Sequence, residues 1–312
     1  MKKILLILCI LSLSTACENE PLDTGFTQDS GDGNAGGNGG SESGDLTLSL
    51  YELDTDLTFS FFGIPLQTIT NSDINISENK ILSSSTAISV EGSPFETDNQ
   101  TYTRNMTGQI TSDISVNSQG QTTNEYIITY TNGSISQITY DYFEDDEDDY
   151  TYNFTYTDNI ITRTEVGSTI STVFTLDGFD RIIKKESFDD TFSIQIETLT
   201  YNGGGNINSS ITTGETESNI TYNFDDNTNP LQIVYNDNYL LNFLADDYSD
   251  EVGALIAQFH STNNWSGATF DGEAFTFDLE YNSIGRILSR DIAYDFGAEL
   301  MIEINERFNY VN

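Results

Sequence analysis

Short segments in which apolar and polar residues alternate fill most of the chain from residue 46 onward, and this pattern limits the fold more than any other feature. In one such segment Tyr152, Phe154 and Tyr156 alternate with threonine and asparagine. A period of two places successive side chains on opposite faces of a β-strand. Turn residues such as Asn132-Gly133 separate these segments at intervals of roughly 9 to 14 residues, the length of one strand plus one turn.

Tight turns make each strand an antiparallel neighbour of the next, because a parallel return needs a long crossover. The sequence therefore predicts an all-β fold, a long antiparallel meander that forms a strongly curved sheet or a partly open barrel. We expect a single domain over residues 46–312. Residues 46–115 are less regular than the rest but are still typical of strands.

One segment departs from the strand pattern and predicts a short helix over residues 249–260. Its apolar residues recur at helical spacing, at Val252, Leu255, Ile256 and Phe259. Asp250 and Glu251 stand in the first turn, where the helix dipole favours acids. We expect this helix to plug an open end or face of the sheet, because an uncovered apolar face promotes aggregation.

The N-terminus is typical of an exported protein. Lys2 and Lys3 precede a short apolar run, and small residues lead from Ser14 to Cys17, which predicts a signal peptide over residues 1–16. The residues before Cys17 resemble a bacterial lipobox, which implies a lipidated Cys17; an ordinary secretory signal followed by a chance cysteine is the alternative. Residues 17–45 carry the lipidated cysteine and end in a Gly/Ser/Asn/Asp-rich stretch, a flexible linker.

The charge and cysteine content exclude several classes of function. Loss of Lys2 and Lys3 leaves 9 of the 11 basic residues against 50 acidic ones. Such a balance excludes nucleic acid as a partner and leaves acyl chains on Cys17 as the expected contact with a membrane. Cys9 lies in the removed segment, so the mature chain has no thiol for a disulfide, a nucleophile or a thiolate metal site.

A repeated turn motif runs through the strand region. An apolar residue is followed by Asn or Asp, two variable residues, Gly, a polar residue and usually an apolar one, in which the Asn or Asp side chain caps the turn and Gly takes a positive φ. The fullest copies span 281–287 and 201–207, and weaker copies span 176–182, 224–230 and 116–122.

In these motifs the chain resembles YD-repeat (Rhs-like) sequences, and more closely the uncharacterised surface lipoproteins of the Bacteroidota that carry such repeats. The resemblance covers roughly residues 100 to 310. It implies a strongly curved, porin-like antiparallel sheet, an acylated end in the outer membrane and a domain outside the cell. Glu18-Asn19-Glu20 looks like the export tag of such lipoproteins. The resemblance carries no catalytic motif.

His260 and Trp265 are each the only residue of their type and are candidate functional residues. His260, the only histidine, excludes a His-based metal cluster, and at the end of the predicted helix we expect it to be a positive imidazole that meets the helix dipole. Trp265, the only tryptophan, is either an exposed platform for a sugar ring or a core residue that closes the helix against the sheet.

An acidic run marks one expected hairpin tip: Glu144, Asp145, Asp146, Glu147, Asp148 and Asp149. Six adjacent carboxylates repel one another, and calcium would relieve that repulsion through oxygen ligands. Simple solvation with counterions is the alternative. Calcium is the one cofactor that the sequence suggests.

Taken together, these features predict a non-enzymatic, outer-membrane-anchored β-domain at the cell surface. We expect it to bind a glycan or a surface protein, or to act as a scaffold. The alternative is a carboxylate-dependent glycan hydrolase, since such an enzyme needs only two well-placed acids among the many present.

Overall fold

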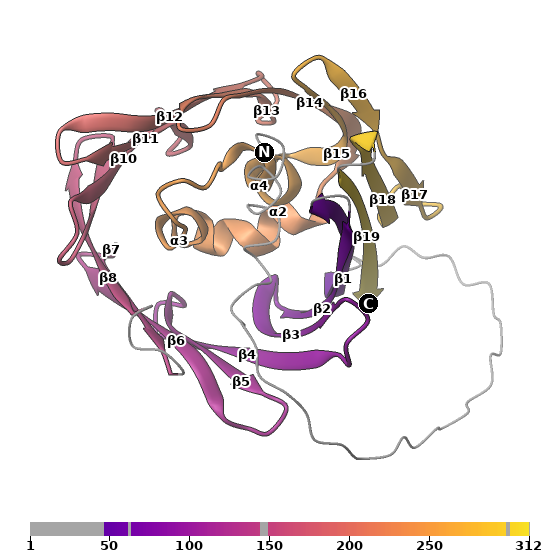
Figure 1. The fold of residues 1–312 in the computed structure, drawn as a ribbon, viewed down its shortest axis with the longest axis horizontal. Coiled ribbons are helices and arrows are strands. Elements are labelled where there is room, and N and C mark those ends of the chain that lie inside the picture. Colours follow the sequence, from indigo (N-terminus) through magenta and orange to yellow (C-terminus); the bar gives the residue numbers. More distant parts are fainter. Residues whose placement is uncertain (1–46, 62–63, 144–148, 298–299, 312) are drawn as a thin grey trace.

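A computed structural model describes residues 47–61, 64–143, 149–297 and 300–311, which form one antiparallel sheet of 19 strands curved into a barrel (Figure 1). The strands are β1 (Thr47–Phe61), β2 (Ile64–Ser77), β3 (Lys80–Val90), β4 (Glu96–Arg104), β5 (Ile110–Asn117), β6 (Thr122–Thr131), β7 (Ser134–Tyr142), β8 (Tyr150–Thr157), β9 (Ile160–Glu165), β10 (Ile170–Leu176), β11 (Ile182–Asp189), β12 (Phe192–Tyr201), β13 (Ile207–Gly214), β14 (Ser218–Thr228), β15 (Asn263–Phe270), β16 (Glu273–Thr276), β17 (Asp278–Tyr281), β18 (Ile287–Asp295) and β19 (Leu300–Val311).

The sheet closes by pairing its first and last strands. β1 pairs with β19 from Thr47↔Val311 to Phe59↔Leu300. A seam lies at β16 and β17, which follow each other along the chain: β16 pairs with β15, and β17 pairs with β18. The predicted all-β meander is confirmed, and the barrel is nearly closed, with a seam.

Inward and outward side chains differ in burial and polarity along the strands. In β19 the inward Ile302, Ile304 and Phe308 are buried, whereas the outward Glu303 and Asn309, each next to one of them, are exposed. This alternation follows from the two-residue period of a strand. The apolar core therefore lies inside the barrel, and the outer face of β19 is largely polar.

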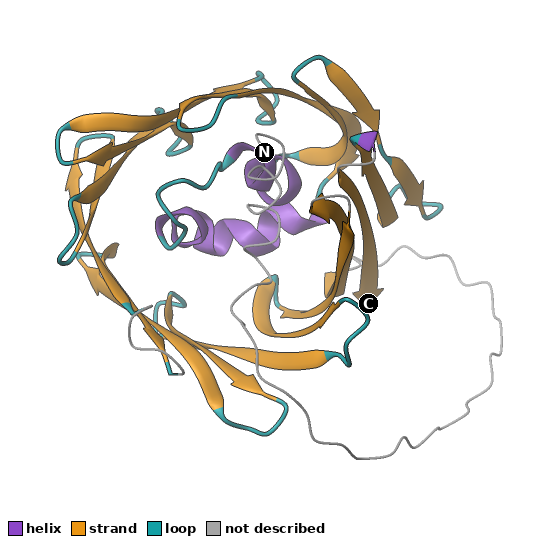
Figure 2. Cartoon of the chain, viewed as in Figure 1, coloured by secondary structure: helices purple, strands orange, loops and turns teal. Residues whose placement is uncertain are grey.

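The segment between β14 and β15 fills part of the barrel interior (Figure 2). We call residues 229–262 the luminal insertion. It contains the helices α2 (Pro230–Tyr235), η2 (Asn236–Asn238), α3 (Tyr239–Leu244), α4 (Gly253–Leu255) and the π-helix η3 (Ile256–His260). None of the helices in the described ranges is long and apolar enough to cross a membrane.

The predicted helix at 249–260 is present, although its helical turns begin at Gly253, after Asp250 and Glu251. The meander predicted from residue 46 onward does not extend through residues 230–245, since α2 and α3 occupy them, and the expectation of strands there was wrong. The Asn229 side chain caps α2 by accepting the Leu231 N–H at 3.0 Å, and Pro230 stands at the first helical position.

The repeated turn motif forms one structure at several hairpins. Asn282 Oδ1 accepts the N–H groups of Ile284 at 3.1 Å and Arg286 at 2.9 Å, and Gly285 takes a φ of 79°. The same pair of side-chain hydrogen bonds recurs in the turns that begin at Asn105, Asn117, Asp177 and Asn202. The predicted capping role of Asn or Asp is confirmed in these turns.

The copy at 224–230 forms no such hairpin, because β14 runs on to Thr228 and the chain then enters the luminal insertion. The motif also missed the turn at Asn105, in which arginine stands where an apolar residue is usual.

Strand direction decides which connections share an end of the barrel. Because the strands from β1 to β15 alternate in direction and Thr47 pairs with Val311, both of these residues and both ends of the luminal insertion lie at one end. We call this the N-terminal end. The end of β7 and the start of β8, which flank residues 144–149 in the sequence, lie at the opposite end.

Candidate functional site

The inner face of β4 to β8 carries a row of directly paired residues, which we call the tyrosine row: Tyr102, Asp113, Tyr126, Tyr140 and Tyr150. Each member stands opposite the next in the register of the sheet. Directly opposite residues lie close enough for their side chains to touch. Five strands therefore present four phenol rings and one carboxyl group to the interior.

The rings of the tyrosine row contact one another. The ring centroids of Tyr126 and Tyr140 are 4.7 Å apart, and those of Tyr140 and Tyr150 are 5.0 Å apart in a stacked arrangement. The hydroxyls of Tyr126 and Tyr150 lie 3.1 Å from each other. Stacked aromatic rings form a flat apolar surface with polar edges.

The tyrosine row faces inward yet remains accessible to water. Tyr126 stands between the inward Asn124 and Ile128, which are buried, whereas the outward Ile127 is 42% exposed. All five members of the row are only partly buried. Partly exposed side chains on the inner face of a barrel are in contact with water, which a ligand bound there would replace.

Asp113 lies in the row with one free oxygen. Its Oδ2 accepts the Gln100 amide N–H at 2.7 Å, and Oδ1 has no hydrogen-bond partner within the described ranges. The Oε1 atom of Gln100 in turn accepts the Tyr102 hydroxyl at 2.9 Å. Burial raises the pKa of the Asp113 carboxyl to about 7, and the Gln100 hydrogen bond opposes this rise.

Asp246, in the luminal insertion, brings a second free carboxyl oxygen to this surface. Its Oδ2 likewise lacks a hydrogen-bond partner in the part of the chain described. Burial, followed by the charge of Asp250, raises the pKa of Asp246 to about 7, and Lys185 and Arg163 oppose this rise. Burial also raises the pKa of Tyr126, and the charges of Asp246 and Asp113 add to it, so both carboxyls lie near this ring.

The barrel wall fixes the position of Asp246 through the backbone of the insertion. Arg163 on β9 donates to the Leu244 carbonyl at 3.1 Å and to the Asp246 carbonyl. Lys185 on β11 donates to the carbonyls of Asp247 at 2.8 Å and Asp250 at 2.6 Å. Ser187 and Gln195 donate to the two carbonyls that lie between these in the sequence, those of Tyr248 and Ser249. Buried cations and amides thus replace the water that these carbonyls would otherwise bind.

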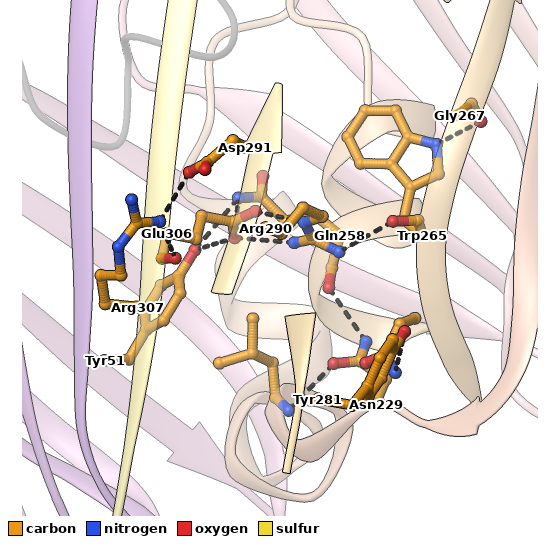
Figure 3. Close-up of polar contacts among 12 residues, drawn as sticks. Tyr51, Asn229, Gln258, Trp265, Gly267, Tyr281, Arg290, Asp291, Glu306 and Arg307 are labelled. Carbon is orange, nitrogen blue, oxygen red and sulfur yellow. Dashed lines mark hydrogen bonds and ion pairs between the residues drawn. The ribbon is translucent and has the colours of Figure 1, made fainter. Parts of the chain in front are cut away.

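A second polar cluster holds the other end of the insertion to the wall (Figure 3). Arg290 on β18 and Glu306 on β19 form an ion pair with side chains 1% and 0% exposed. Tyr51 donates its hydroxyl hydrogen to Glu306, and Gln258 of η3 donates to the same carboxylate at 3.0 Å. This cluster lies among packed side chains and serves as an anchor.

The structure places the residues singled out in the sequence as follows. Trp265 lies in β15, 2% exposed, with its ring against Tyr222 and Phe277 and its Nε1–H bonded to the Gly267 carbonyl at 2.9 Å. It therefore occupies the core position rather than an exposed platform, because neighbouring aromatic rings cover it.

His260 is the last residue of η3 and is buried. Burial lowers the pKa of its imidazole to about 3, so the charged imidazole expected at the helix end was wrong. Its Nδ1 lies 3.1 Å from Asn236 Oδ1, a contact within the packed insertion.

The remaining sequence candidates lie largely outside the described residues. These include Cys17 with the whole of 1–46, and Glu144 to Asp148. Asp149 is described, and its Oδ1 accepts the Tyr142 N–H at 2.7 Å. Within the described ranges no group of three or more His, Cys, Asp or Glu side chains is placed to hold a metal ion. Calcium at residues 144–149 stays a prediction.

Comparisons with known proteins find only solved structures, with low TM-scores and low sequence identity. No protein-family model matches the chain, and a search of curated proteins finds no match. Among solved structures, the chain is similar to a porin-like protein from Bacteroides uniformis, with a TM-score of 0.45 and 11% identity over 85% of this chain and 96% of that one.

A porin-like protein from Bacteroides vulgatus gives a TM-score of 0.24 and 11% identity, over 85% of this chain and 99% of that one. The TcdB2-TccC3-TEV structure gives a TM-score of 0.29 and 10% identity, over 76% of this chain and 15% of that one. The neighbours thus include Bacteroides porin-like proteins, and the YD-repeat family itself stays a prediction.

Proposed function

We propose that this chain is a lipid-anchored β-domain of the bacterial outer membrane, exposed at the cell surface, that binds a glycan inside its barrel. The tyrosine row carries this proposal, since it places four partly exposed rings beside two free carboxyl oxygens. Sugars bind proteins through the stacking of their C–H faces on aromatic rings and through hydrogen bonds from their hydroxyls to polar groups.

The position of the N-terminus supports an orientation on the membrane. Thr47, the first described residue, lies at the N-terminal end of the barrel, and the segment 17–46 precedes it. Lipid on Cys17 would hold that end toward the membrane. The end of β7 and the start of β8, which flank the acidic run in the sequence, would then lie away from it.

The alternative is a carboxylate-dependent glycan hydrolase. Such an enzyme divides the work between a protonated acid and an ionised carboxylate, whose environments push their pKa values apart. Burial raises the pKa of both Asp113 and Asp246 to about 7, so the two groups offer no such division. This similarity favours binding over hydrolysis.

Removal of one ring from the tyrosine row should weaken glycan binding. We expect Tyr140→Ala to lower the affinity for the best glycan of a panel by about tenfold, because stacking on a ring contributes about 1 kcal/mol or more. Isothermal titration of the full-length protein would measure the change.

Two control variants separate the loss of ring stacking from a general effect of substitution. Tyr140→Phe keeps the stacking ring and should retain most of the affinity, and Phe192→Ala removes an exposed aromatic residue from the first position of β12 without effect. If no glycan in the panel binds, or if Tyr140→Ala binds as tightly as the unchanged protein, the proposal is wrong. A scaffold or a protein-binding role would then take its place.

Substitution of Cys17 tests the lipid anchor directly. We expect Cys17→Ser to move the protein from the membrane fraction to the aqueous fraction, because two or three acyl chains supply the stable attachment. Labelling with a fatty-acid analogue should mark the unchanged protein and not the variant. Retention of Cys17→Ser in the membrane fraction would contradict acylation at this residue, and protease treatment of whole cells would report exposure at the surface.

A further inference from the structure

Asp113 stands between two aromatic residues in the tyrosine row. Tyr102 on β4 and Tyr126 on β6 are its direct cross-strand partners, one on each side. The Gln100 amide holds one carboxyl oxygen, Oδ2, at 2.7 Å. The other oxygen, Oδ1, is enclosed and has no hydrogen-bond partner among the described residues. A buried oxygen without a partner costs free energy, and a ligand donor would remove that cost.

The barrel already uses tyrosine rings to hold cations. The guanidinium of Arg163 lies 4.4 Å from the ring centroid of Tyr152, next to the tyrosine row on β8. The guanidinium of Arg181 lies 4.1 Å from the ring centroid of Tyr201. A cation over an aromatic face is attracted by the negative charge of the π-system, and exclusion of water strengthens that attraction.

The basic side chains near the row bind groups other than Asp113: Arg163 and Lys185 lie near Asp246, and Arg104 on β4 donates to the Gly108 carbonyl at 2.8 Å. Arg163 and Lys185 oppose the rise in the pKa of Asp246, and their hydrogen bonds go mainly to backbone carbonyls of the insertion. Among the described residues, the pKa of the Asp113 carboxyl is set by burial and the Gln100 hydrogen bond, and no basic residue contributes to it. The formal net charge of −39 also raises the concentration of cations around the protein.

We propose that Asp113 binds the protonated amine of a ligand between the rings of Tyr102 and Tyr126, so that the glycan bound by this domain carries free amino groups. The inference rests on the proposed function. One N–H of the ammonium donates to Asp113 Oδ1, and the two rings flank its other hydrogens. The sugar rings then stack on Tyr140 and Tyr150, the next members of the row.

Titration calorimetry of the full-length protein with matched oligosaccharides tests this assignment. The probes are a glucosamine hexamer, an N-acetylglucosamine hexamer of the same length, and spermidine as an amine without sugar. We expect the glucosamine hexamer to bind about tenfold more tightly than the acetylated one, as one desolvated ion pair with cation–π contacts would give. Asp113→Asn should remove this preference, so that the two hexamers bind the variant with equal affinity.

The control variant is Asp278→Asn, which removes one negative charge from an exposed position of β17. If Asp113→Asn loses the preference for the glucosamine hexamer and Asp278→Asn keeps it, the amine site is supported. If both variants lose the preference equally, the preference comes from the overall negative charge of the protein, and the proposal is overturned. Equal affinity for the two hexamers overturns the amine site but leaves glycan binding intact. If spermidine binds in a manner that depends on Asp113 and neither hexamer binds, the amine site is supported, but its ligand is an amine other than a glycan.

Discussion

Replacement of Glu306 by alanine should lower the free energy of unfolding by about 3 to 5 kcal/mol, because it leaves the Arg290 guanidinium buried without a counter-charge. Both side chains are almost fully buried, so water cannot take the place of the lost carboxylate. The substitution also removes the acceptor for Tyr51 and Gln258, and with it one attachment of η3 to the wall. Urea unfolding followed by the fluorescence of Trp265, the only tryptophan, would measure the loss.

A neighbouring ion pair on the same two strands provides the control. Arg307 on β19 pairs with Asp291 on β18 at 2.6 Å, but these side chains are 42% and 45% exposed. Asp291→Ala should therefore cost less than about 1 kcal/mol. Joint replacement of Arg290 and Glu306 by methionine and leucine should recover much of the stability, because no unpaired charge remains. A small effect of Glu306→Ala would mean that water reaches this cluster.

The sequence predicts the architecture well because strand period and turn chemistry are local properties. Alternation in segments such as 152–156 decides which side chains face inward, and the Asn or Asp of each repeated turn bonds residues only two and four positions ahead. The helices α2 and α3 were missed although Asn229-Pro230 is a helix-start signal. Their short apolar runs are equally typical of strands. The packing inside the barrel that favours helices at these residues depends on the other strands and cannot be predicted from this segment alone.

The tyrosine row could not be predicted from the sequence, because it depends on the register of five strands at once. Bulges interrupt the pairing at Thr103/Arg104, Ser115/Val116 and Thr129/Tyr130. Each bulge shifts the opposing residues by one position, which changes the partners along the rest of the strand. Asp246 adds a further requirement, since wall residues from β9 to β12 place it opposite the row. Tyr126, Tyr140 and Tyr150 therefore looked like ordinary strand residues.

Replacement of Asp113 or Asp246 by asparagine should make the protein more stable than the unchanged protein at about pH 8, and leave the two equally stable near pH 4. Both carboxyls have a pKa of about 7 in the folded protein, well above the ordinary value near 4 in the unfolded chain. The folded state therefore binds more protons between these two values, and stability falls as the pH rises through this window. The loss reaches at most about 4 kcal/mol for each carboxyl, and contact with water will reduce it.

Thermal unfolding of the unchanged protein and each variant across this pH range would measure the difference. The comparison with the variant matters because other acids also titrate. Burial raises the pKa of Glu197 to about 7. Burial is also the largest single influence on Asp177, but hydrogen bonds from Arg181 and the backbone together outweigh it and hold the pKa of Asp177 below its usual value. Asp278→Asn, at an exposed position, should follow the unchanged protein at every pH. If Asp113→Asn and Asp246→Asn do so as well, water solvates both carboxylates fully, and the enclosed oxygen on which amine binding depends does not exist.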